Sequence, residues 1–236
     1  MSTSPLVIAI DGPSGSGKSS VSRAVARSLG LAYLDTGAMY RAATWACLED
    51  GVPLDDQPAV AARVAAMRLA LGLDPQAPTV VVDGVDVAEA IRETRISAAV
   101  SAVATNLDAR AELGRRQRAV IDHERSGGWS GGAGVVAEGR DITTVIAPDA
   151  DVRVLLTASE EARLARRSLD VHGAADAASI AATRDQVLRR DADDSTVVQF
   201  RVAADGVATV DSSHLDFDQT VQAVLDVVTQ VTGGRG

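Results

Sequence analysis

The most informative part of the sequence is Leu6-Val-Ile-Ala-Ile-Asp-Gly-Pro-Ser-Gly-Ser-Gly-Lys-Ser-Ser20. Its first five residues form a short apolar run rich in β-branched side chains, which is typical of a strand buried on both faces. The glycine-rich segment that follows matches the pattern G-x-x-x-x-G-K-[ST], and a helical apolar pattern starts at Lys18. A strand, a glycine loop and a helix in this order are the context in which that pattern marks a phosphate-binding loop.

The expected loop holds phosphate mainly through its backbone. Glycines let the chain turn its N–H groups inward, and the start of the helix adds the positive end of its dipole. We expect Lys18 to reach the β and γ oxygens of a bound nucleotide, and Ser19 to hold the Mg²⁺ that arrives with it. The predicted ATP-binding set is Gly12, Pro13, Ser14, Gly15, Ser16, Gly17, Lys18, Ser19 and Ser20.

Lysine usage supports a special role for position 18. The chain has 23 basic residues, and Lys18 is its single lysine. An ammonium is a compact point charge, whereas a guanidinium is a planar fork, so a site that keeps lysine indicates a need for the point charge. With no second lysine, the chain cannot carry the N-K-x-D motif by which GTPases read guanine. The apolar run that ends at Glu138 matches the acidic strand of ATPases only loosely.

Length and composition exclude several classes of protein. The 236 residues are 46% hydrophobic and carry a net charge of −9, which favours one folded core and excludes a largely disordered chain or a nucleic-acid coat protein. One cysteine and three histidines exclude an internal disulfide and a zinc site. We find no apolar run long enough for a membrane span and no signal peptide. We therefore expect a cytoplasmic monomer whose single domain spans residues 1–236.

Short buried strands alternate with helices along the chain, which predicts an α/β fold with a central, mainly parallel five-stranded sheet flanked by helices. Asp83-Gly84 lies between two β-branched runs and predicts a hairpin, and so a small antiparallel β insertion. We place this insertion in a second ligand-binding region of about residues 37–105. The glycine-rich segment Ser126 to Gly134 is expected to be a flexible connection.

Two arginine motifs follow predicted strands. Asp35 to Arg41 places Arg41 one turn into a helix, and Glu138-Gly-Arg-Asp141 places Arg140 at the end of a buried strand. In a parallel sheet the ligand lies at the carboxyl ends of the strands, so both guanidinium groups should face it. Two converging arginines beside a phosphate loop predict a second phosphate.

A third arginine-rich region is predicted to form a helical lid over about residues 159–197. Its arginines include Arg163, Arg167 and Arg190, and such a pair of helices could close over a triphosphate and exclude water. The alternative is an ordinary solvated helical face. The lid interpretation follows once the phosphate loop is accepted.

Together these motifs resemble the bacterial cytidylate kinases, a family of nucleoside monophosphate kinases with a P-loop. The resemblance rests on IDGPSGSGKSS (10–20), LDTGAMYR (34–41) and AEGRDI (137–142) in this order, and the hairpin is similar to the family's enlarged monophosphate-binding region. It implies a P-loop kinase that transfers the γ-phosphoryl group of ATP, with Mg²⁺, to CMP or dCMP. The alternatives are a kinase for another small acceptor and a P-loop nucleotide sensor that transfers nothing.

The resemblance also implies roles for individual residues. Arg41 and Arg140 would bind the acceptor phosphate, and the segment Arg190 to Ser195 resembles the lid motif R-D-x-x-D-S. One position departs from the family pattern: Val197 stands where a lid arginine is usual, so either Arg201 substitutes or acceptor binding is weaker. The predicted catalytic set is Lys18, Arg140, Arg163, Arg167 and Arg190; the predicted substrate-binding set is Thr36, Tyr40, Arg41, Ser101, Arg110, Arg140, Asp141 and Asp194, with Ser101, Arg110 and Asp141 at the cytosine edge and Asp194 at the ribose.

Overall fold

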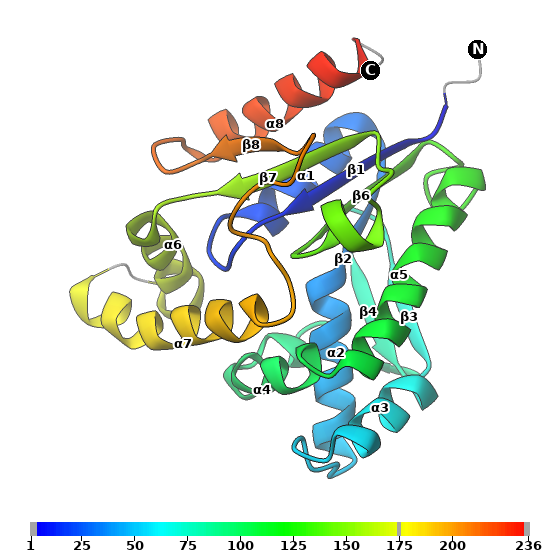
Figure 1. Cartoon of the computed structure of the whole chain (residues 1–236), viewed down its shortest axis with the longest axis vertical. Coiled ribbons are helices and arrows are strands. Elements are labelled where there is room, and N and C mark those ends of the chain that lie inside the picture. The colour runs from blue at the N-terminus through cyan, green and yellow to red at the C-terminus, as the bar shows by residue number, and fades with distance from the viewer. Residues whose placement is uncertain (1–3, 174–175, 234–236) are drawn as a thin grey trace.

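A five-stranded parallel sheet forms the centre of the molecule in a computed structural model that describes residues 4–173 and 176–233 (Figure 1). The strands lie in the order β2-β6-β1-β7-β8, and every neighbouring pair is parallel. The predicted α/β fold is therefore confirmed. The strand bounds are β1 (Leu6–Asp11), β2 (Ala32–Asp35), β6 (Gly134–Gly139), β7 (Val152–Thr157) and β8 (Ala208–Asp211).

Helices cover both faces of this sheet (Figure 1). Ile8 and Ile10 of β1 point toward one face, where they join an apolar cluster with α1 (Lys18–Leu29) and α8 (Phe217–Thr232). Val7 and Ala9 alternate to the other face. Because both faces are buried, the strand reads as a continuous apolar run instead of an alternating one. The second face is covered by α2 (Thr36–Glu49) and α5 (Leu107–Ser126), and α3 (Gln57–Ala66) packs against these two helices.

The predicted hairpin is present in a second sheet of three antiparallel strands. Its turn uses Asp83 and Gly84, both with positive φ (52° and 89°), as a tight turn between right-twisted strands requires. The Asp83 carboxylate also accepts the backbone N–H of Arg68 at 2.9 Å. The region contains β3 (Leu69–Gly72), β4 (Thr79–Val82), β5 (Val85–Asp86), the 3₁₀ turn η1 (Ala90–Arg92) and α4 (Thr94–Ala104).

Two helices, α6 (Glu160–His172) and α7 (Ala177–Ser195), pack as a pair at the carboxyl edge of the large sheet (Figure 1). Arg184 of α7 pairs with Glu160 of α6 at 2.8 Å, so charges of opposite sign join the two helices. Gly15 of the phosphate loop approaches α6 so closely that a Cβ atom there would lie 2.4 Å from the Arg163 carbonyl oxygen. The arginine-rich pair thus lies directly on the loop.

A one-turn π-helix, η2 (Ile142–Ile146), follows β6 and was not predicted. It is anchored by Asp11, whose buried carboxylate accepts the N–H of Ile142 at 2.9 Å, the N–H of Thr143 at 2.8 Å and the Thr143 hydroxyl at 2.6 Å. Burial raises the pKa of Asp11 to about 6, although these hydrogen bonds oppose the rise. Asp11 therefore ties the end of β1 to the segment that directly follows Arg140 and Asp141.

Asp11→Ala is expected to lower the free energy of unfolding by about 3 kcal/mol, because three buried donors lose their acceptor. The folded pKa near 6 exceeds the ordinary 3.8, so Asp11 stabilises the fold most when protonated and contributes less as the pH rises through 6. Urea unfolding at pH 7 and pH 5 should show a wider gap between wild type and variant at pH 5. An equal gap at both pH values would contradict the raised pKa. Asp218→Ala, on the exposed side of α8, is the control.

The glycine-rich connection before β6 is more ordered than its composition predicts. Glu124 is fully buried and accepts the N–H groups of Trp129 at 2.8 Å and Ser130 at 2.9 Å. The expectation of a flexible segment was therefore wrong. The glycines serve a compact turn wrapped around one carboxylate.

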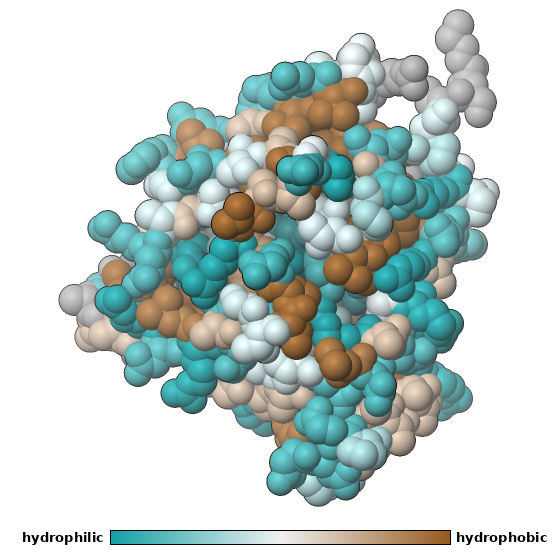
Figure 2. All heavy atoms as spheres, in the orientation of Figure 1, coloured by the Kyte–Doolittle hydropathy of each residue, from teal (hydrophilic) through white to brown (hydrophobic). Residues whose placement is uncertain are grey.

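The surface is mixed in hydropathy. On the face seen in Figure 2, hydrophobic residues form separate patches among hydrophilic ones. Across residues 4–173 and 176–233, every helix is too short or too polar to cross a membrane.

Candidate active site

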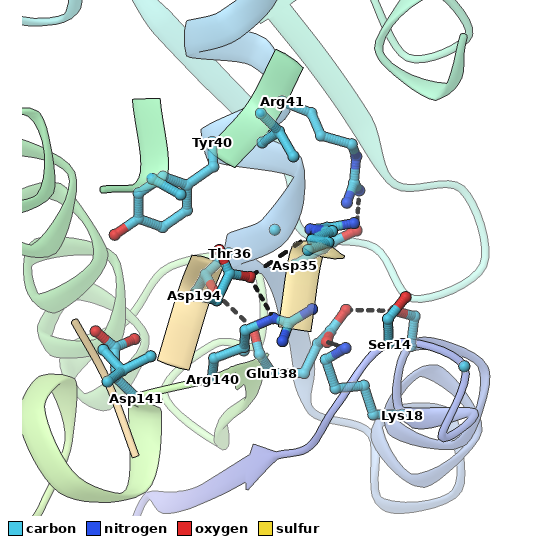
Figure 3. Close-up of a pocket in the computed structure, with 18 of the residues that line it drawn as sticks. Ser14, Lys18, Asp35, Thr36, Tyr40, Arg41, Glu138, Arg140, Asp141 and Asp194 are labelled. Carbon is cyan, nitrogen blue, oxygen red and sulfur yellow. Dashed lines mark hydrogen bonds and ion pairs between the residues drawn. The ribbon is translucent and has the colours of Figure 1, made fainter. Parts of the chain in front are cut away.

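A cavity of about 170 Å³ opens at the carboxyl ends of β1, β2 and β6, between the phosphate loop, α2, α4 and the helical pair α6–α7. Figure 3 shows Tyr40 and Asp141 at one end, Lys18 and Ser14 at the other, and Thr36, Arg140 and Asp194 between them. Most of the predicted site residues line it: Ser14, Gly15, Gly17, Lys18, Ser19, Ser20, Thr36, Tyr40, Arg41, Arg110, Arg140, Asp141, Arg167, Arg190 and Asp194.

Five predicted residues lie outside the lining. Gly12, Pro13 and Ser16 are buried within the phosphate loop itself, and a Cβ atom on Gly12 would lie 2.3 Å from the Leu156 carbonyl oxygen. Ser101 lies on α4 between the lining residues Val100 and Ala104, and its carbonyl oxygen accepts the Thr105 hydroxyl. Arg163 contacts the phosphate loop but does not line the cavity. Of the three residues predicted for the cytosine edge, Arg110 and Asp141 line the cavity and Ser101 does not.

The phosphate loop has the backbone that its sequence predicts. Gly15 and Gly17 adopt φ of 76° and 85°, which residues with a Cβ rarely adopt. Gly17 is the N-cap of α1, and no side chain caps that helix start. The first N–H groups of α1 are therefore available to an anion.

Lys18 lies in a network of charges at the ends of two paired strands. Its Nζ atom is 3.8 Å from Glu138 Oε2, and Ser19 Oγ donates to Glu138 Oε1 at 2.6 Å. Burial and then Asp35 raise the pKa of Glu138 to about 7, while burial lowers the pKa of Lys18. Asp35 and Glu138 face each other in the β2–β6 register. Sequence reasoning ranked Glu138 only as a weak ATPase-like acid and missed Asp35, although both end strands that lead into the site.

Four guanidinium groups gather beside this network. Arg41 pairs with Asp35 at 2.9 Å, and Arg140 with Asp194 at 2.8 Å. Burial, then the charges of Arg140 and Arg41, lowers the pKa of Arg190 to about 10. The buried atoms Arg190 Nε and Asp194 Oδ1 have no hydrogen-bond partner among the described residues. Arg167 completes the cluster, which is arranged to receive an anion.

Asp191 of α7 links the helical pair α6–α7 to the phosphate loop, and sequence reasoning missed it. Its carboxylate lies 2.5 Å from Arg163 Nη1 and 2.7 Å from Arg140 Nη1, and it accepts the Ser14 N–H at 3.2 Å. Burial opposes its charge, but Arg140 and the hydrogen bonds hold the pKa of Asp191 below its ordinary value. Arg163 Nη1 also donates to the Ser14 carbonyl oxygen at 2.8 Å. The helical pair thus packs directly on the phosphate loop.

The other end of the cavity carries a paired carboxylate and guanidinium. Arg110 donates to Asp141 through Nη2 and to the Ala104 carbonyl oxygen at 2.9 Å through Nη1. The Arg110 guanidinium carbon lies over the Tyr40 ring, 5.7 Å from the ring centroid. Burial raises the pKa of Asp141, although Arg110 opposes the rise. One acceptor and one donor are therefore held side by side at this end of the cavity.

Comparison with known proteins agrees with this geometry. A family model described as cytidylate kinase matches residues 8–230. The chain belongs to the cytidylate kinase family. The match confirms the resemblance, and with it the kinase class of enzyme.

Curated relatives match over nearly their whole length. A cytidylate kinase of Cutibacterium acnes is 50% identical, over 97% of this chain and 98% of the relative. Cytidylate kinases of Streptomyces avermitilis and Rhodococcus jostii are 44% and 45% identical, over 95% and 99% of this chain and 93% and 99% of theirs. The roles of individual residues in this member of the cytidylate kinase family stay predictions.

Proposed function

We propose that the protein uses this cavity to transfer the γ-phosphoryl group of ATP to CMP or dCMP, giving ADP and CDP or dCDP. The observation that carries this proposal is the cluster of half-buried guanidinium groups between two different sites. On one side lies a phosphate loop with a free helix start, and on the other lies the Arg110–Asp141 pair. A nucleoside triphosphate and a nucleoside monophosphate together supply phosphate oxygens, which guanidinium groups bind strongly.

Positioning and charge neutralisation supply most of the catalysis in phosphoryl transfer. The amides of the phosphate loop and Lys18 hold the donor phosphates. Arg41 and Arg140 hold the acceptor phosphate. Thr36 also lines the cavity, and its hydroxyl donates a hydrogen bond to the Glu138 carbonyl oxygen at 2.7 Å. Arg167 and Arg190 face the space between donor and acceptor, where negative charge develops on the transferred group.

The donor set near Ser19 fits Mg²⁺. Ser19, Asp35 and Glu138 offer hydroxyl and carboxylate oxygens, the ligands that Mg²⁺ prefers. Burial and then the nearby Asp35 carboxylate raise the pKa of Glu138, and a dication bound beside them would favour the charged form of Glu138. When bound with ATP, Mg²⁺ neutralises the phosphate oxygens; Ser19 would hold it, with Asp35 and Glu138 nearby.

The base-reading end favours cytosine among the candidate acceptors. Asp141 can accept from the exocyclic amine of cytosine, and Arg110 can donate to its ring acceptors. Uracil would place a carbonyl against the Asp141 carboxylate. This complementarity argues for CMP or dCMP over another small acceptor, and the contacts of the lid with the acceptor side argue for an enzyme over a sensor.

An ADP-release assay with a panel of CMP, dCMP, UMP and AMP tests the proposal. We expect turnover with CMP and dCMP, and at least about a hundredfold lower kcat/KM for UMP. ATP binding with no turnover on any acceptor would favour the sensor. A higher kcat/KM for UMP or AMP would favour a different acceptor.

Arg190→Ala is expected to lower kcat by about a hundredfold while changing the KM for ATP less than threefold. The reason is that Arg190, whose buried Nε has no hydrogen-bond partner among the described residues, lines the cavity where the negative charge on the transferred group would be redistributed in the transition state. Steady-state kinetics with both substrates measure the split. Arg189→Ala is the matched control, because Arg189 is the exposed neighbour on the same helix. A rise in KM alone would make Arg190 a ground-state ligand.

A further inference from the structure

Phe200 is a buried aromatic residue whose ring lies against a charged group. Its ring centroid lies 4.4 Å from the Arg140 guanidinium carbon, and the side chain is 2% exposed. It belongs to neither of the two apolar clusters that cover the sheet. A cation over an aromatic ring is attracted by the negative face of the ring quadrupole, and the attraction is stronger when both groups are desolvated.

Two carboxylates also hold the Arg140 guanidinium along one edge. Nη1 binds Asp191 and Nε binds Asp194, both from α7, while Phe200 lies against the guanidinium and follows the same helix in sequence. Arg140 itself starts from the end of β6 and lines the cavity. The lid and the segment after it thus hold this guanidinium by two carboxylates and one aromatic ring, with the rest of its edge toward the proposed acceptor phosphate.

The same segment lacks the arginine that the family pattern expects. Val197 occupies that position, Val198 lines the cavity, and Arg201 is exposed outside the lining. Arg201 therefore does not substitute for the missing arginine in this structure. The acceptor phosphate must depend more heavily on Arg41 and Arg140, so the orientation of Arg140 matters more in this chain.

We propose that Phe200 is a positioning residue for Arg140: its ring holds the guanidinium in the orientation that binds the acceptor phosphate and supports the acceptor site where the lid arginine is absent. This inference rests on the proposed function, since it assigns Arg140 to the acceptor. It predicts that the electron density of the ring, and not only its volume, sets the affinity for CMP.

Fluorinated phenylalanines at position 200 test the inference, because each added fluorine weakens the negative face of the ring with little change in shape. From phenylalanine through 4-fluoro to 3,4,5-trifluoro-phenylalanine, kcat/KM for CMP should fall stepwise to about a tenth, while the KM for ATP stays within twofold. In Phe200→Leu, kcat/KM for CMP should fall at least as far. The same analogues at Phe217, half-exposed on α8, are the control. A flat series at position 200 would overturn the inference.

A second readout needs no turnover. In the nucleotide-free protein, the Arg140 δ protons should show an upfield ring-current shift by NMR, assigned by comparison with Arg140→Lys, and Phe200→Leu should remove it. An Arg140 signal unchanged in Phe200→Leu would also overturn the inference. If wild type does not phosphorylate CMP at all, the proposed function fails, and the NMR comparison still decides whether Phe200 holds Arg140.

Discussion

Lys18→Arg is expected to lower kcat by roughly 10²- to 10³-fold with the fold intact, although the charge is conserved. Lys18 Nζ lies 3.8 Å from Glu138, and Arg140 and Arg190 are close enough to lower its pKa. A planar guanidinium there would meet two other guanidinium groups and could not enter between phosphates as a point charge does. The single lysine of the chain is thus placed where arginine fits least.

Steady-state kinetics and thermal unfolding of Lys18→Arg, measured side by side, check this result. Arg27→Lys is the matched control, because Arg27 is exposed on the same helix and the variant replaces arginine with lysine instead of lysine with arginine. Near-normal turnover in Lys18→Arg would remove the proposed role of the ammonium. To separate lost activity from lost structure, the variant must unfold within a few degrees of wild type.

Asp141→Asn is expected to lower kcat/KM for CMP by about a hundredfold and to narrow the gap between CMP and UMP. The carboxylate is buried against Arg110 and can accept from the cytosine amine, whereas an asparagine amide can donate to the uracil carbonyl. The variant also leaves Arg110 without its charged partner, which adds to the loss with CMP.

The measurement is kcat/KM for CMP and UMP in wild type and in Asp141→Asn. Asp185→Asn, an exposed change on α7, is the control for loss of one negative charge. If the CMP to UMP ratio is the same in both proteins, Asp141 does not read the base.

Features that depend on local sequence were predicted well. The strand, glycine loop and first helix follow from adjacent residues, and the Asp83-Gly84 turn needs only positive φ at two positions. The five parallel strands follow from alternating buried runs. Their spatial order could not be read from the chain, because β1 pairs with β6 and β7, which follow it by more than a hundred residues.

Features that depend on distant pairs were missed. Asp11 meets Thr143 across 132 positions, and Asp191 meets Ser14 across 177. The sequence around a single aspartate does not reveal such a distant partner. It does not reveal the contact between Phe200 and Arg140 either. Glycine content misled the prediction for residues 126–134, because composition cannot reveal that a buried Glu124 would gather the backbone N–H groups.

The most direct test of the account follows the phosphoryl group itself. ATP labelled in the γ-phosphate is mixed with excess enzyme and CMP, and the products of a single turnover are separated. The account predicts that the label appears in the β-phosphate of CDP in step with ADP formation. Label found in inorganic phosphate, or retained in ATP while both nucleotides are bound, would contradict transfer to CMP in this cavity.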